Sequence, residues 1–566
     1  MAMHKDRAGL DEFQGDASMK AFNQGFLKVI LIVSILPLVP VFLLSLTPAG
    51  LLLVAVVAYF AWPAFQRGVN QLFRGIWEFV TSIFVGFFKL IGLLLIGLLK
   101  GLGLLLKAFG LSFGWLAGLN LPSTRFMGWF ERWRLLNASN QGPLVDGRSA
   151  RLTETAGYES LLVQGGMGRG KSSTFVLPNL LSPPNKQPSF VISDTSGELY
   201  QASSGYLASR GYLIRVLNLM DPAHSETYNP LANATAPQHL ADLAKTLVRS
   251  ASGRTMGQAA HDPFWDQSAE KLIRILAQCL LNQPDPAFRN LANLRRLVLG
   301  FDAHVAPQGQ LGQIDRFVLA ATQNDQSTFA AYRAFVQGNL KTIQSVLMTA
   351  DVALDAIATP EMAALTATNT LKFSELRQQP IALYVMVNQT QMELYAFLLN
   401  LFYADLFKSL LKDPANPGRP VWLFLDEFGH LQIPGFEVFA TTARKYKVSY
   451  SLFLQSLAQL EGRYGPHNAR TIIEGLGSEI YLPGTSLDTA RNLEARLGRT
   501  DKAPLMAASD IIRMDENQAL LLYSNRLPIL LKTKRYYQRA DLRHRAKKSP
   551  APLPQTGGRT PRLIQL

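Results

Sequence analysis

The sequence predicts an α/β domain with a phosphate-binding loop, preceded by an N-terminal α-helical membrane region. Three observations predict it. Residues 29–66 form a run of 38 without Asp, Glu, Lys or Arg, which is longer than one membrane span needs. Residues 160–181 have the pattern of a strand, a glycine-rich loop and a helix, in that order. Residues 421–425 are apolar and are followed by two acids, as expected of a buried central strand.

The composition excludes a disordered chain and a chain held together by disulfides. The 566 residues are 48% hydrophobic and 17% charged, which predicts two or three domains with buried cores. Lys and Arg number 56 against 41 Asp and Glu, and the net charge of +15 favours polyanionic partners such as nucleic acid or acidic lipid. The single cysteine, Cys279, excludes an intrachain disulfide and a cysteine-based zinc site. Its leucine-rich neighbourhood predicts a buried packing thiol.

Residues 1–120 form the predicted membrane region. Of the 21 residues in 26–46, 16 are Leu, Ile, Val or Phe, and we expect this segment to insert as the first span. The apolar run is too long for a signal peptide. A turn at Thr47-Pro48 then predicts a hairpin whose second span is 49–66. Residues 79–119 carry three lysines on one helical face, so they form either a helix lying on the inner leaflet or a second span with snorkelling lysines. In both cases we expect the rest of the chain to be cytoplasmic.

The glycine-rich loop, 165–172, has the residue types that phosphate binding requires. Glycines let consecutive backbone N–H groups turn towards phosphate oxygens, and the start of the following helix adds partial positive charge. Lys171 can reach the terminal phosphates, and Ser172 can ligate Mg²⁺. The alternative is a glycine turn with a surface lysine. The predicted nucleotide-binding residues are Gly165, Gly166, Met167, Gly168, Arg169, Gly170, Lys171, Ser172 and Ser173.

A loop that binds nucleotide also needs carboxylates for the metal and for the attacking water. Asp426 and Glu427 directly follow the apolar strand 421–425. Asp426 would hold Mg²⁺, directly or through water, and Glu427 would orient and deprotonate water for in-line attack on the γ-phosphate. Paired acids after an apolar strand also occur as plain helix starts. Together with the loop upstream, they favour ATP hydrolysis.

With these features the sequence resembles the VirD4/TraG/TraD family of type IV secretion coupling proteins, membrane-anchored relatives of the FtsK and HerA pumping ATPases. Besides the loop, the matching motifs occur in family order at 191–199, 228–231, 425–428, 454–460, 464–465 and 521–537. The sequence departs from the family pattern at Thr195-Ser196, where proline and lysine are usual. What that turn contacts is therefore open, and Asp194 and Glu198 beside it are weak site candidates.

The resemblance implies a RecA-like α/β motor domain interrupted by an all-α insertion domain, with the N-terminal transmembrane region in front. Helical patterns at 264–281 and 329–357 fit the insertion, and strand patterns resume at 381–387. The expected domains are the membrane region 1–120, the first part of the motor 121–236, the insertion 237–371, the second part of the motor 372–540 and a basic, flexible tail 541–566.

The resemblance also suggests two further catalytic residues besides Lys171 and Glu427. Gln455 matches a glutamine at the end of the next strand, which is placed to sense the γ-phosphate; the alternative is a polar strand end. Arg444 matches a position where some members carry an arginine thought to act on the neighbouring subunit's nucleotide. The alternative for Arg444 is an ordinary basic helix face.

By resemblance, the chain is expected to be a multi-pass ATPase of the bacterial inner membrane that uses ATP and Mg²⁺ as a homo-oligomer, a hexamer. Its expected partners are channel components of a type IV secretion system, inner-membrane lipids, DNA, and either a relaxase–DNA complex or effector proteins. The alternatives are a docking receptor whose nucleotide only orders the ring, and an FtsK-type DNA pump. The pump is less expected, because the chain ends soon after the motor. Residues 532–548 carry eight Lys or Arg and one acid, and would either contact DNA or acidic lipid or form a solvated terminus.

Overall fold

The computed structural model describes residues 124–166, 168–234, 237–251, 263–301, 311–426, 428–500, 503–555 and 560–565, with a few single residues between 62 and 86. The chain divides into two units after Leu121, and the fold below is that of the second unit. The predicted spans 26–46 and 49–66 lie outside the described residues, apart from Trp62, as does most of 79–119. Among the described residues, no helix has both the length and the apolar character that a bilayer crossing requires.

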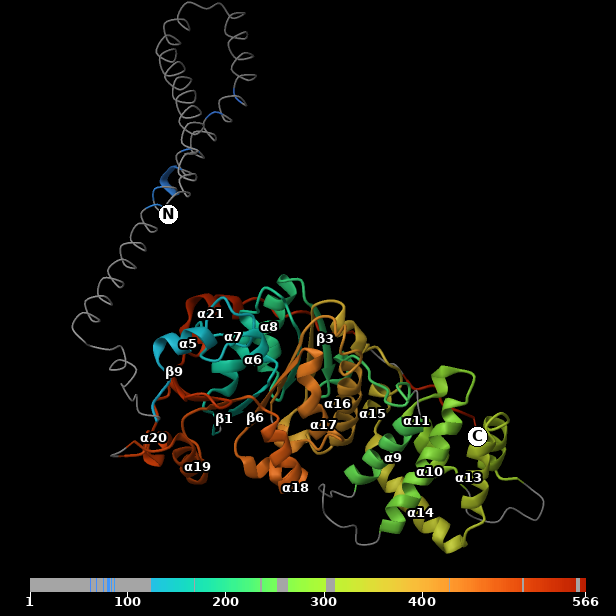
Figure 1. The fold of residues 1–566 in the computed structure, drawn as a ribbon. Helices are drawn as coiled ribbons and strands as arrows, with labels where there is room; N and C mark the ends of the chain where they lie inside the picture. Colours follow the sequence, from blue (N-terminus) through green and yellow to red (C-terminus); the bar gives the residue numbers. More distant parts are fainter. Residues whose placement is uncertain are drawn as a thin grey trace, which may run out of the picture. The chain divides into compact units, whose positions relative to one another are not determined.

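A mixed, mainly parallel sheet forms the centre of the described unit (Figure 1). Within the described residues its nine strands run in the order β3-β4-β2-β5-β6-β1-β7-β8-β9. The strands are β1 (Leu161–Gln164), β2 (Ser189–Asp194), β3 (Leu213–Asn218), β4 (Ile381–Met386), β5 (Val421–Leu425), β6 (Val448–Leu454), β7 (Ser478–Tyr481), β8 (Gln518–Tyr523) and β9 (Ile529–Lys532). Across the sheet, the seven strands from β3 through β1 to β7 pair in parallel, whereas β8 and β9 add an antiparallel edge. The central strands are buried throughout, which explains why they appear in the sequence as unbroken apolar runs.

Helices cover both faces of this sheet (Figure 1). Alternate residues of β1 point to opposite sides, so Leu161 and Val163 join one hydrophobic core and Leu162 joins the other. The first core includes the π-helical turn η2 (Lys171–Val176), α7 (Leu177–Leu181), α8 (Glu198–Ser209) and α21 (Ala540–Ala546). The second core includes α16 (Ala396–Leu410), α17 (Phe436–Thr442) and α18 (Leu457–Glu474). The other α-helices described outside the segment between β3 and β4 are α5 (Trp129–Leu135), α6 (Glu154–Gly157), α19 (Leu487–Leu497) and α20 (Ala508–Ile512).

The described residues between β3 and β4 form helices and no strand from Pro237 onward. The helices are α9 (Pro237–Ala251), α10 (Pro263–Leu281), α11 (Leu291–Leu299), α12 (Gln313–Ala321), α13 (Gln326–Val336), α14 (Leu340–Leu354) and α15 (Pro360–Leu365). The sequence pattern suggested a helical stretch over 329–357, but α13 ends at Val336 and a new helix begins after Asn339. The Asn339 side chain accepts the Lys341 N–H at 3.0 Å and caps the start of that helix.

Cys279 lies on the buried face of α10, as its sequence neighbourhood predicted. Burial raises the pKa of its thiol to about 12, so the thiol stays protonated at neutral pH. The prediction of a packing residue is confirmed.

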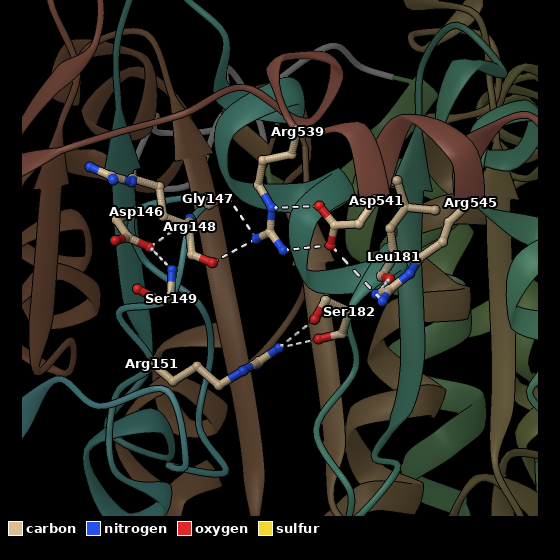
Figure 2. Close-up of polar contacts among 10 residues, drawn as sticks. All are labelled: Asp146, Gly147, Arg148, Ser149, Arg151, Leu181, Ser182, Arg539, Asp541 and Arg545. Atoms are coloured by element: carbon tan, nitrogen blue, oxygen red, sulfur yellow. Dashed lines mark hydrogen bonds and ion pairs between the residues drawn. The ribbon is translucent and has the colours of Figure 1, made fainter.

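The end of the chain differs from the predicted flexible, basic tail. Figure 2 shows Arg539 beside the loop that precedes β1. Its guanidinium donates to the carbonyl oxygens of Gly147 at 3.2 Å and Arg148 at 2.6 Å. Its other two nitrogens donate to the two carboxylate oxygens of Asp541 at 3.1 and 2.7 Å. Arg539 therefore joins the loop that precedes β1 to α21.

A second arginine fixes α21 to the helix that follows the glycine loop. Arg545 donates to the carbonyl of Leu181, the last residue of α7, at 2.8 Å (Figure 2). Cations stabilise the carbonyl end of a helix, where four acceptors lack partners within the helix. Leu542 of α21 is fully buried. The described part of 541–566 is therefore packed against the domain, because Arg545 satisfies a backbone carbonyl and Leu542 joins the core.

Candidate functional site

Three parallel strands bring their carboxyl ends to one edge of the sheet. Leu452 of β6 pairs with Leu162 of β1 on one side and with Leu425 of β5 on the other. Neighbouring strands lie about 4.8 Å apart, so β1 and β5 are separated by about 10 Å. The glycine loop after β1, Asp426 after β5 and Gln455 after β6 therefore follow adjacent strand ends.

The glycine loop has a tight, left-handed backbone. Gly168 has φ 67° and Gly170 has φ 90°, a region that side chains with a Cβ rarely enter. The Thr174 N–H donates to the Gly170 carbonyl at 2.7 Å, which closes the first turn of η2. The Lys171 ammonium lies back over the loop and donates to the Gly165 carbonyl at 3.2 Å. Met167 lies outside the described residues.

Charged residues from the last part of the chain, Glu516 and Arg535, flank this loop, and the sequence did not predict them. Glu516 pairs with Arg169 of the loop, N to O 3.6 Å, and with Arg535, 3.1 Å. A methyl group built on Gly170 would lie 3.4 Å from Arg535 Nε, so this guanidinium borders the loop. Arg535 also donates to the Tyr537 hydroxyl at 2.8 Å. The sequence signal that points to these residues is the tyrosine pair at 536–537, which matches the family's pattern and directly follows Arg535.

The acid side of the edge is built from β5 and β6. The carbonyl of Asp426 accepts the Ser193 hydroxyl of β2 at 3.2 Å, which fixes the backbone where β5 ends. Glu427 lies outside the described residues. The Gln455 N–H donates to the Gln459 side chain at 3.2 Å, and its own side chain is half-buried. The structure thus brings the loop, Asp426 and Gln455 to one edge.

Arg444 lies at the other edge of the sheet. It belongs to the 3₁₀ turn η9 (Ala443–Tyr446), which precedes β6, so the length of this strand separates it from Gln455. Its guanidinium pairs with Glu159 at 2.8 Å, and its side chain is 62% exposed. Within one chain, the structure does not bring Arg444 to the glycine loop.

The weak candidate Asp194 has a structural task. Its buried carboxylate accepts the N–H groups of Gly197 and Tyr200, both at 2.8 Å, at the start of α8. Burial raises the pKa of Asp194, although these backbone bonds act in the opposite direction. The turn in which the sequence departs from the family pattern is thus closed by this aspartate. Glu198 occupies the first turn of α8.

The Tyr228 motif connects the sheet to the helical insertion. The Tyr228 hydroxyl donates to Asp405 of α16 at 2.6 Å, and Asn233 donates to the same oxygen at 3.3 Å. Asn229 donates to the carbonyl of Arg289, within the insertion, at 2.6 Å. Burial raises the pKa of Asp405, while the bonds from Tyr228 and Asn233 lower it. This motif therefore fixes the root of the insertion.

Comparison with known proteins gives a family match and two curated relatives for this sequence. Residues 131–502 match the family described as Type IV secretory system Conjugative DNA transfer. Protein VirD4 of Agrobacterium fabrum (strain C58 / ATCC 33970) and Protein VirD4 of Rhizobium rhizogenes are each 22% identical over 414 residues, 66% of this chain and 58% of theirs. The chain therefore spans less than two thirds of the length of these curated relatives.

Solved structures of the bacterial conjugative coupling protein TrwB are similar in fold. Its trigonal form in complex with sulphate is 18% identical with a TM-score of 0.55, covering 73% of this chain and 93% of that one. Its complex with ADP and Mg²⁺ is 16% identical with a TM-score of 0.54 and the same coverage. The likeness confirms the α/β part of the predicted fold class. Because the family match extends over well over half of the 566 residues, the chain belongs to the conjugative DNA transfer family of type IV secretory systems, as its motifs predicted.

Proposed function

We propose that this chain is a membrane-anchored, ATP-hydrolysing coupling protein that drives substrate into a type IV secretion channel. The observation that carries the proposal is the shared edge where the glycine loop, Asp426 and Gln455 follow β1, β5 and β6. Phosphate binding and metal binding at adjacent strand ends are the parts that a phosphate-loop ATPase requires. Family membership supplies the context of transfer. The substrate is a DNA–relaxase complex or an effector protein.

The residues at this edge fit ATP and Mg²⁺. The loop has left-handed glycines, and Lys171 can exchange its bond to the Gly165 carbonyl for bonds to phosphate. Ser172 and Asp426 would hold Mg²⁺, which supplies charge neutralisation at the phosphates when bound. Glu427 would take the proton of the attacking water, and Gln455 would respond to the terminal phosphate. The TrwB complexes with ADP and Mg²⁺ and with an ATP analogue support this assignment.

The position of Arg444 supports an action on a neighbouring subunit. Its guanidinium is exposed and held by Glu159 at the edge away from the glycine loop, so it cannot serve its own nucleotide. A closed head-to-tail ring would present this edge to the next subunit's loop. We therefore propose a homo-oligomeric ring, a hexamer, in which the arginine acts in trans.

The membrane region belongs to the same proposal. Residues 1–120 would anchor the chain in the bacterial inner membrane, with the motor in the cytoplasm beside the channel components. Because Cys279 is the single cysteine and is buried, an engineered cysteine can be labelled cleanly. Ser139→Cys, on the exposed loop before β1, is expected to react in inside-out vesicles and not in intact cells.

Steady-state ATPase activity of the full chain in detergent tests the site. Lys171→Ala is expected to abolish hydrolysis, whereas the control Lys186→Ala, which removes a surface lysine paired with Glu154, is expected to keep it. Full activity of Lys171→Ala would overturn the proposal. Activity that rises steeply with protein concentration is expected of a ring.

Arg444 and Glu159 form a matched pair for the action in trans. Either substitution, Arg444→Ala or Glu159→Gln, breaks the same ion pair, in which the Arg444 side chain is 62% and the Glu159 side chain 19% exposed, and which contributes on the order of 1 kcal/mol to stability. Only Arg444→Ala is expected to lower the rate, by about 10³-fold or more where the arginine stabilises the transition state. Equal activity of the two variants would show that Arg444 has only the surface role.

Export separates a motor from a docking receptor. Glu427→Gln is expected to leave nucleotide binding intact and to stop hydrolysis. Loss of plasmid and effector export in this variant supports the motor, whereas unchanged export would favour a receptor whose nucleotide only orders the ring.

A further inference from the structure

The end of the chain leaves the motor and contacts the helical insertion. The Ala551 N–H donates to Ser204 of α8 at 3.1 Å, and Tyr200 of the same helix donates to the Ala551 carbonyl. Residues 562–564 lie instead against α11 and the short turn η4 (Pro286–Phe288) of the insertion. In Figure 1 the red end of the chain runs to the helices of the insertion.

Two buried asparagines of the insertion contact the backbone of this segment. Asn293 donates to the Arg562 carbonyl at 2.9 Å and accepts the Ile564 N–H at 2.9 Å. Asn290 donates to the same Arg562 carbonyl at 3.2 Å. A single amide that bonds a carbonyl and an N–H two residues apart binds an extended backbone as a neighbouring strand would. Both asparagines are completely buried.

The same surface distinguishes alternate side chains of the segment. The Arg562 guanidinium pairs with Asp285 at 2.6 Å and stacks over the Phe288 ring at 4.8 Å. Ile564 is buried in the main core, whereas Leu563 between them is 47% exposed. Extended chains alternate their side chains in this way. The surface therefore selects an arginine and, two residues later, an aliphatic side chain, and leaves the middle position open.

The insertion itself prepares this surface. The Asn290 amide also donates to the Ala287 carbonyl at 2.9 Å, and the Asn293 amide to the Phe288 carbonyl at 2.8 Å. Asn290 further accepts the Asn293 N–H and caps α11. Both amides are thus oriented by η4 and α11 independently of the segment that they bind. Such preorganisation lowers the entropic cost of binding.

The bound segment is held by few contacts. The ion pair is largely exposed, with Arg562 64% accessible, and exposed pairs contribute little. Because the segment is tethered at Ala551, its effective concentration at the surface is high, and this keeps it bound without high intrinsic affinity. A partner segment that binds the surface with higher intrinsic affinity can therefore displace it.

We propose that Asp285, Phe288, Asn290 and Asn293 form a docking site for an extended segment of a protein partner, with arginine followed two residues later by Ile or Leu. The chain's own 562–564 occupies this α11 site until the partner arrives. The inference deepens the proposed function, since the partner would be a protein substrate or the protein bound to transferred DNA.

The test uses a fluorescein-labelled peptide with the sequence of residues 559–566, Arg-Thr-Pro-Arg-Leu-Ile-Gln-Leu, and fluorescence anisotropy. The proteins are the full chain and a chain that ends at Gln555, both in detergent and without nucleotide. The shortened chain is expected to bind the peptide at least tenfold more tightly than the full chain, because its α11 site is open. Equal affinity, or no binding to either chain, would overturn the proposal.

Charge exchange separates recognition from misfolding. In the shortened chain, Asp285→Arg is expected to weaken binding about fivefold and to regain it for a peptide that has glutamate at the position of Arg562. Alanine at the Leu563 position of the peptide is expected to change affinity less than twofold, since that side chain is exposed. Failure of the exchange, with the shortened chain folded, would overturn the site. Because binding is measured without ATP, a fully active Lys171→Ala would overturn the proposed function and leave this result standing.

Discussion

Tyr228→Phe is expected to loosen the root of the insertion by a measurable amount. The substitution removes the 2.6 Å bond from the Tyr228 hydroxyl to Asp405 and leaves the longer bond from Asn233, at 3.3 Å. Both ends of the lost bond are in the interior. Hydrogen bonds to charged groups contribute about 1.5 to 3 kcal/mol, so we expect a loss of about 2 kcal/mol in local opening free energy. At 1.4 kcal/mol per tenfold, this corresponds to roughly 30-fold faster exchange of the protected amides.

The measurement is deuterium exchange of α16 in the full chain, corrected for the intrinsic pH dependence of exchange. Because burial places the folded-state pKa of Asp405 above its unfolded value, its contribution to stability is present at low pH and is lost as pH rises through the folded pKa. Removing the Tyr228 donor raises that pKa further. The effect of Tyr228→Phe is therefore expected to be larger at neutral than at acidic pH.

Tyr212→Phe is the matched control. The Tyr212 hydroxyl is buried and has no hydrogen-bond partner among the described residues, and its ring stacks on Phe190 with centroids 5.4 Å apart. Its removal is expected to leave exchange unchanged or slower, since an unpaired buried hydroxyl is unfavourable. If Tyr228→Phe accelerates exchange less than threefold, or no more than the control, the Asp405 bond does not hold the insertion.

Two further substitutions are checked by the midpoint of thermal unfolding. Gly147→Ala would place a methyl carbon 2.0 Å from the Lys534 carbonyl oxygen and is expected to lower the midpoint strongly. Gly211 has φ 85° but open space around it, so Gly211→Ala is expected to cost only about 1 to 2 kcal/mol of stability. Equal shifts of the midpoint in the two variants would contradict the packing around Gly147. Burial raises the pKa of Glu479, but its bonds, led by those from Arg496, leave that pKa below the ordinary value, so the stability it contributes is lost as pH falls through the folded pKa. Arg496→Met is expected to lower the free energy of unfolding by about 1 to 2 kcal/mol at pH 7.5 and by less near pH 4; this is less than for a buried ion pair, because the Arg496 side chain is 42% exposed. A loss that does not depend on pH would contradict this.

Local patterns in the sequence predicted the parts of the fold whose signals are local. The strand at 161–164, the glycine loop and the strand at 421–425 each combine a short apolar run with a specific turn. The expectation that their ends meet follows from parallel pairing and agrees with the register around β6. The position of Arg444 before β6 already implied the opposite edge, because the two ends of a strand face opposite edges.

The contacts that sequence reasoning missed join residues far apart in the chain. The Glu516 pairs beside the glycine loop and the docking of Arg562 on the insertion depend on side chains that meet only after folding. An arginine that donates to a backbone carbonyl produces no periodic pattern in the sequence. A stretch of such arginines therefore looks the same in the sequence as a run of solvated charges. For that reason the sequence predicts a flexible tail after 540, where the structure has a packed helix.

The arginine contacts of Figure 2 have a consequence for ionic strength. In 532–548, at least four of the eight basic side chains already have partners in the protein: Arg535, Arg539, Arg545 and Lys548. Each single-strand phosphate that a free cation neutralises adds roughly 0.7 to the slope of log affinity against log salt. Arg535 and Arg539 are already neutralised by the carboxylates of Glu516 and Asp541, so the slope for single-stranded DNA should be smaller by roughly 1.4 than a count of the basic residues in this stretch suggests.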